Sequence, residues 1–153
     1  MIPKRLFLFS LFSLLFSLSA FSQTAAEIDT LLSQETVSVT SAARYVLGAA
    51  GTLPPELSGA AAEAEAYTTA RSNGWLTSTA NESITMKELS YLIMKAFDLK
   101  GGVMYKLLRN PRYAYREMIY RKVIQGRADP AMNVSGQRLL QIIGRTLSYA
   151  GEL

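Results

Sequence analysis

The sequence predicts an all-α protein, and two observations carry this prediction. Apolar residues recur at helical spacing, as where Ile28, Leu31 and Leu32 occupy positions i, i+3 and i+4. Glycine, proline and hydroxyl residues stand where helices would begin and end. The chain also lacks cysteine and histidine, so its stability depends on a packed core rather than on disulfides. The same absence excludes Cys/His metal sites and catalysis by either side chain.

The first 22 residues have the layout of a secretory signal peptide. Lys4 and Arg5 precede a long apolar run, and the small residues Ala20 and Ser22 stand before an expected cut at Gln23. Removal of this segment leaves about 131 residues (153 less 22), the size of one domain over residues 23–153. No later apolar run approaches the roughly 20 residues of a membrane span. We therefore expect an exported protein of the periplasm or cell surface.

Three helices are expected in the first half of this domain. The first runs from Ala26 to Leu32. Thr40 is the expected N-cap of the second, which Gly51 ends. The third covers residues 59–72 and ends before Asn73-Gly74.

The fourth helix has the strongest local signal. In Thr85-Met86-Lys87-Glu88, a hydroxyl at the cap and a carboxylate three residues later would satisfy each other's backbone amides, as in a capping box. Gly101-Gly102 is expected to stop this helix, because glycine adopts the left-handed conformation readily.

Two further helices complete the prediction. Pro111 starts one that Gly126 ends, and Ser135 caps a last helix that ends near Gly151. The methionines are interpreted as core residues: Met86, Met94, Met104, Met118 and Met132.

The six helices fall into three similar helix-loop-helix units, over residues 24–51, 59–101 and 108–151. Each second helix follows a β-branched residue and a hydroxyl residue: Val39-Thr40, Ile84-Thr85 and Val134-Ser135. Each first helix ends in an apolar pair: Leu31-Leu32, Trp75-Leu76 and Val123-Ile124. Such internal similarity is typical of a repeat architecture. We interpret Trp75 as a core anchor, with a sugar-stacking platform as the alternative.

The repeated unit resembles the S-layer homology (SLH) domain. The resemblance lies in Ile84-Thr85-Met86-Lys87-Glu88-Leu89 and in the stretch from Lys122 to Pro130. It implies a pseudo-threefold bundle in which the three Thr/Ser-led helices pack centrally. It also implies a non-catalytic module that binds or anchors to an anionic cell-wall polymer. The family's Thr-Arg-Ala-Glu motif has Met86 in place of its arginine here.

Charge is divided sharply along the chain. Residues 23–82 hold seven acids and two bases, whereas residues 83–153 hold five acids and twelve bases. The stretch 105–127 is the most basic, and tyrosines interleave its cations. The guanidinium of arginine donates two parallel hydrogen bonds to a carboxylate or a phosphate. This segment therefore indicates a docking patch for an anionic polymer or an acidic protein face. The alternative is a solvated basic surface that complements the acidic half of the same molecule.

No pattern of catalytic residues accompanies these features. Glu63 and Glu65 are two apart on a helix and point in different directions, so they do not form a catalytic pair. The chain also contains neither a glycine-rich phosphate-binding loop nor a nucleophile elbow centred on serine. We expect no enzyme, no cofactor and no metal, and an exported protein would not meet nucleic acid. The candidate ligand-binding residues are Lys87, Lys106, Arg109, Arg112, Tyr113, Arg116, Arg121 and Arg138.

A second function stays open beside polymer binding. The chain could be a periplasmic structural or adaptor protein that keeps the SLH-like fold and binds another envelope protein. Cations that converge on a groove between units would favour the polymer, and cations spread over a convex face would favour the protein partner.

Overall fold

The computed structural model describes residues 25–126 and 129–151, and these residues confirm the all-α prediction. The expected signal peptide, residues 1–22, lies outside the described residues, as does Arg127 of the basic segment. The described chain has no strand and only two isolated β-bridges, and none of its helices is long and apolar enough to cross a membrane.

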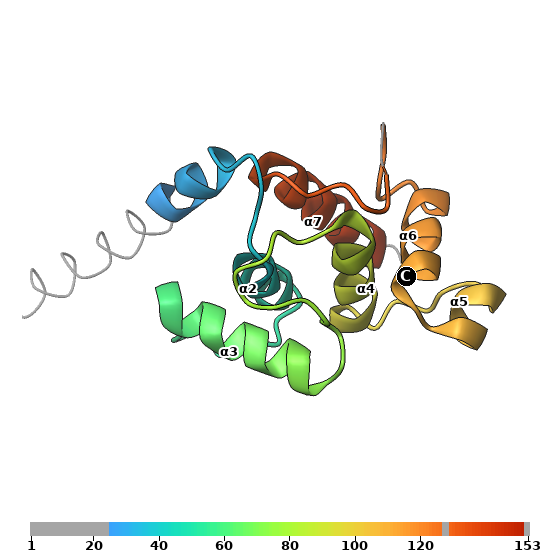
Figure 1. Ribbon diagram of the computed structural model, residues 1–153, viewed down its shortest axis with the longest axis horizontal. Helices are drawn as coiled ribbons and strands as arrows, with labels where there is room; N and C mark the ends of the chain where they lie inside the picture. Colours follow the sequence, from blue (N-terminus) through green and yellow to red (C-terminus); the bar gives the residue numbers. More distant parts are fainter. Residues whose placement is uncertain (1–24, 127–128, 152–153) are drawn as a thin grey trace, which may run out of the picture.

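Seven helices make up the described fold, arranged along one long axis (Figure 1). The N-terminal helix covers residues 25–32. The others are α2 (Val39–Ala49), α3 (Gly59–Ser72), α4 (Met86–Ala96), α5 (Val103–Leu108), α6 (Pro111–Tyr120) and α7 (Gly136–Gly151). The most extensive helix contacts are those of α2 with α3 and of α4 with α6, and α2 also contacts α4 and α7.

The core forms where α2, α4 and α7 turn their apolar faces inward. Val46, Leu92 and Ile142, one from each helix, are all at most 1% exposed. Trp75 is half-buried and packs against this core, as an anchor would. Burial of this apolar surface is the main source of stability in a chain without disulfides.

Three backbone hydrogen bonds link the segments that enter α2, α4 and α7. Val37 donates its N–H to the carbonyl of Val134 (2.8 Å), Val134 donates to Ile84 (3.1 Å), and Ile84 donates to Val37 (2.9 Å). These bonds close a ring. All three residues are fully buried, so the ring satisfies backbone groups that water cannot reach.

A second set of bonds fixes the helix starts around this ring. The first residue of each helix donates its N–H to a neighbouring loop carbonyl: Val39 to Glu82 (2.9 Å), Met86 to Met132 (2.9 Å) and Gly136 to Gln34 (3.0 Å). The amides at the start of a helix have no partner within the helix. The three loops supply those partners and so hold the starts of α2, α4 and α7 together.

The helix starts differ in detail from the prediction. Ser38, not Thr40, is the N-cap of α2, and its Oγ accepts from the N–H of Ser41 at 3.2 Å. The helix starts two residues early because Val37, rather than Val39, occupies the hydrogen-bonded ring.

The predicted capping box at the start of α4 is wrong, although Thr85 is its N-cap. The Thr85 Oγ1 is buried and has no hydrogen-bond partner. The Glu88 carboxylate, 6% exposed, accepts instead from the N–H groups of Thr77 and Ser78 (3.1 and 3.0 Å) and from the Ser78 hydroxyl (2.7 Å). Glu88 therefore holds the α3–α4 loop rather than its own helix start.

Two helices end earlier than predicted. α4 stops at Ala96 rather than at Gly101-Gly102, because Asp98 takes the left-handed conformation (φ 48°) and Leu99 donates to the Met94 carbonyl (2.9 Å). α6 stops at Tyr120 rather than at Gly126, because Lys122 also takes the left-handed conformation (φ 58°). The residues between the end of α4 and the start of α6 hold an additional helix, α5, that the sequence did not predict.

Candidate functional site

The candidate site is the surface formed by α5 and α6, which we call the α5–α6 face. A tight connection sets the two helices against each other. Arg109 ends α5 in the left-handed conformation (φ 38°, ψ 50°), and the Asn110 side chain accepts from the Tyr113 N–H (3.1 Å). Pro111 occupies the first turn of α6, where its missing N–H costs nothing. These local features fix the orientation of α5.

Tyr105 is the single buried residue of α5. Its ring lies directly over Gly101, where an added Cβ would come within 2.2 Å of the ring. Burial, with a smaller contribution from Tyr91 and an opposing one from Arg109, raises the pKa of the Tyr105 hydroxyl to about 12. Tyr105 thus anchors α5 to the fold, and Gly101 makes room for it.

The rest of α5 points its apolar side chains outward. Val103 is 80% exposed, Leu107 74% and Met104 50%. On the adjoining α6, Tyr120 is 83% exposed. A shallow pocket of about 330 Å³ lies between the two helices and is lined by Val103, Met104, Tyr113, Arg116 and Tyr120, among others. Large exposed apolar patches are typical of interaction sites, which makes this surface the candidate.

Four of the predicted cations lie on the α5–α6 face and are exposed: Lys106, Arg109, Arg112 and Arg116. The Arg116 guanidinium lies over the ring of Tyr113, 5.9 Å from its centroid. The ion pairs described within residues 25–126 and 129–151 involve none of these four. The α5–α6 face therefore combines positive charge with apolar surface.

Arg121 has a different role. Its Nε donates to the Glu117 carboxylate at 2.7 Å, and another of its guanidinium nitrogens donates to the Lys100 carbonyl. The guanidinium also lies 4.9 Å from the ring centroid of Tyr149 on α7. Arg121 joins α6, the α4–α5 connection and α7, so its hydrogen-bonding groups are engaged within the fold.

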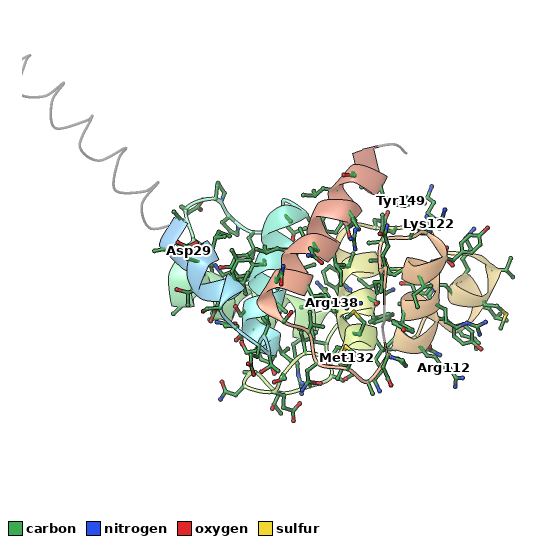
Figure 2. The ribbon with its side chains drawn as sticks, turned by 90° about the horizontal axis from the view of Figure 1, so that it is seen from above. Asp29, Arg112, Lys122, Met132, Arg138 and Tyr149 are labelled. Atoms are coloured by element: carbon green, nitrogen blue, oxygen red, sulfur yellow. The ribbon has the colours of Figure 1, made fainter. Side chains whose placement is uncertain are left out.

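Lys87 and Arg138 lie apart from the α5–α6 face. Lys87 is exposed at the start of α4, and its backbone N–H donates to Pro130 in the α6–α7 loop (3.0 Å). Arg138 donates from its guanidinium to the Gln125 carbonyl of the same loop (3.1 Å). Figure 2 shows Arg138 near the middle of the molecule and Arg112 at the end of α6. The predicted residues therefore do not form one site.

The charge division of the sequence is also a division in space. In Figure 2, Asp29 of the N-terminal helix lies at the opposite end of the molecule from Arg112. The two ion pairs of the described residues, Arg44 with Glu27 and Arg121 with Glu117, each stay within one half of the chain. These pairs give no support to the alternative in which the basic segment complements the acidic half.

Sequence reasoning missed the apolar part of this surface. The sequence predicts no helix between the stop at Gly101-Gly102 and the start at Pro111, and it predicts a core position for Met104, whereas Met104 is half exposed. Of the other methionines, Met86, Met94 and Met118 are buried as expected. The signal was present in Val103, Met104 and Leu107, which share one face at helical spacing.

No cluster of acidic residues in the described part of the chain could hold a metal ion. Comparison of the chain with protein-family models, with curated proteins and with solved structures found no match.

Proposed function

We propose that this chain is a non-catalytic binding or anchoring module of the cell envelope that docks through the α5–α6 face. The observation that carries the proposal is the gathering of four exposed cations with exposed apolar side chains on one short segment. An anionic ligand would contact Lys106, Arg109, Arg112 and Arg116, with Tyr113 beneath Arg116. The export of the chain follows from the expected signal peptide.

The proposal includes an SLH-like arrangement of three repeats around a pseudo-threefold axis. The closed ring of hydrogen bonds among Val37, Ile84 and Val134 supports it, because each residue donates to one neighbour and accepts from the other. The matching bonds from the first residues of α2, α4 and α7 also support it. In this arrangement α5 is an insertion between the second and third units.

An anionic cell-wall polymer is the ligand that the SLH resemblance suggests. Retention of the chain on purified sacculi tests this, with binding expected at low salt and lost at high salt. The decisive variant replaces Lys106, Arg109, Arg112 and Arg116 by glutamine, and Arg71→Gln, at an exposed cation of α3, is the control. If the unaltered chain is not retained on sacculi at low salt, an anionic cell-wall polymer is not its ligand.

A second candidate is an adaptor that binds another envelope protein. The exposed apolar side chains Val103 and Leu107 favour it, because an anionic polysaccharide offers them little apolar surface. Crosslinking in intact cells from Leu107, followed by identification of the attached species, tests this candidate. A protein crosslinked from Leu107 and not from Lys87 is the expected result, and equal crosslinking from both sites would contradict it.

A further inference from the structure

α5 points most of its apolar side chains outward, unlike the core helices α2, α4 and α7. A helix on the surface of a globular protein normally faces its apolar residues inward. In α5, Val103, Met104 and Leu107 share the outer face, and only Tyr105 is buried. This orientation places apolar side chains in water at a free-energy cost that a partner would remove.

The exposed charges beside this apolar face are positive, and the carboxylate of Glu117 also lines the pocket between α5 and α6. The cations Lys106, Arg109, Arg112 and Arg116 are exposed beside it, and residues 99–116 contain no acidic residue. The nearest acid along α6, Glu117, is paired with Arg121. Segments that lie on anionic membranes combine an apolar face with Lys and Arg beside it.

The position of α5 suits contact with a flat surface. α5 lies at one end of the long axis of the molecule and packs on α6 (Figure 1). The acidic N-terminal helix lies toward the other end. A molecule divided in this way would turn its basic end toward a negative surface.

We propose that the outer face of α5 docks on an anionic lipid bilayer. Val103, Met104 and Leu107 enter the boundary between headgroups and acyl chains, and the four cations contact lipid phosphates. This inference rests on the proposed envelope function and names the partner of the α5–α6 face. A lipid surface accounts for both the apolar and the cationic side chains, whereas a wall polymer accounts for the cations alone. A protein partner would instead need a complementary acidic and apolar groove.

Vesicle cosedimentation tests the proposal. The chain is used from Gln23 onward, which retains every described residue and removes the apolar leader, itself able to bind lipid. We expect cosedimentation with vesicles of phosphatidylglycerol and phosphatidylcholine, little with phosphatidylcholine alone, and a decrease at high salt.

Matched variants locate the contact. We expect Leu107→Ser to weaken binding by about tenfold, through loss of inserted apolar area. Leu32→Ser is its control, because Leu32 is an exposed leucine (45%, against 74% for Leu107) on the N-terminal helix, away from α5. Arg112→Gln should weaken binding about fivefold by removing one cation from the lipid surface, and Arg71→Gln, which removes an exposed cation of α3, should not. Circular dichroism verifies that each variant is folded.

The outcomes separate this inference from the function on which it rests. Vesicle binding that is unchanged by both Leu107→Ser and Arg112→Gln would overturn the α5 contact. Retention on sacculi, or crosslinking to a protein, without vesicle binding would overturn the lipid partner and leave the envelope function standing. Absence of all three interactions would overturn both proposals.

Discussion

Replacement of Gly136 by alanine tests the packing of α7 against the N-terminal segment. Gly136 is the first residue of α7 and is buried, and its N–H donates to the Gln34 carbonyl at 3.0 Å. An added Cβ would lie 1.7 Å from the Leu31 carbonyl oxygen and 2.6 Å from the Leu31 carbonyl carbon. Both of these atoms are backbone, so no side-chain rotation can make room.

The expected cost follows from this geometry. Overpacking of a buried site costs about 1–3 kcal/mol, and the displaced Gly136 N–H would lose a hydrogen bond worth about 1 kcal/mol. Alanine's higher helix propensity returns less than about 1 kcal/mol. The central values of these three terms give an expected net loss in the free energy of unfolding for Gly136→Ala of about 2–3 kcal/mol. A loss of this size would lower Tm by roughly 5–12 °C in a domain of this length.

Urea unfolding, followed by circular dichroism and by the fluorescence of Trp75, measures this loss. Gly144→Ala is the control, because Gly144 lies in the same helix, is exposed, and has nothing within 4 Å of an added Cβ. We expect Gly144→Ala to stabilise the chain by about 0.5–1 kcal/mol. Equal effects of the two substitutions, or a loss below about 0.5 kcal/mol for Gly136→Ala, would refute the reasoning.

Three further predictions concern other parts of the fold. Glu88→Ala should cost about 3 kcal/mol in urea unfolding, because the Thr77 and Ser78 amides lose their buried acceptor; a cost below about 1 kcal/mol would show that water replaces the carboxylate. Burial raises the pKa of Tyr105 to about 12, above the unfolded value of about 10. The stability that comes from keeping this hydroxyl protonated in the fold is therefore complete below pH ~10 and is lost as the pH rises toward 12. Tyr105→Phe should reduce the fall in unfolding free energy between these pH values by about 1–2 kcal/mol, and an unchanged fall would contradict the assignment. Lys122→Gly should raise the unfolding free energy by about 0.5–1 kcal/mol, since glycine accepts the left-handed conformation (φ 58°) without strain; destabilisation would show that the Lys122 side chain makes a contact worth more than the strain.

The sequence predicted the existence of most helices well and their ends less well. The apolar stripe of α4 identified that helix, because helical spacing is a property of the local sequence. Its end at Ala96 was missed because a non-glycine residue, Asp98, takes the left-handed conformation. Local sequence gives little warning of this, since the backbone cost is met by burial of the following Leu99.

The site-residue prediction names groups that the fold treats differently. Lys106, Arg109, Arg112 and Arg116 are all exposed on α5, on α6 and at the turn between them, because they are close in sequence. Arg138 and Lys87 were grouped with them from motif position alone, and the fold places Arg138 against the Gln125 carbonyl. Whether an arginine is free or engaged depends on neighbours that are distant in sequence.

The sequence alone determined the helical class, the exclusion of disulfide and Cys/His chemistry, and the division of charge along the chain. These follow from composition and from local spacing. Only the tertiary structure decided that the entry segments of α2, α4 and α7 close a ring of hydrogen bonds, and that α5 faces its apolar residues outward. Both depend on which segments meet in space: the ring joins backbone groups 47 to 97 positions apart, and α5 is turned by the burial of Tyr105 over Gly101.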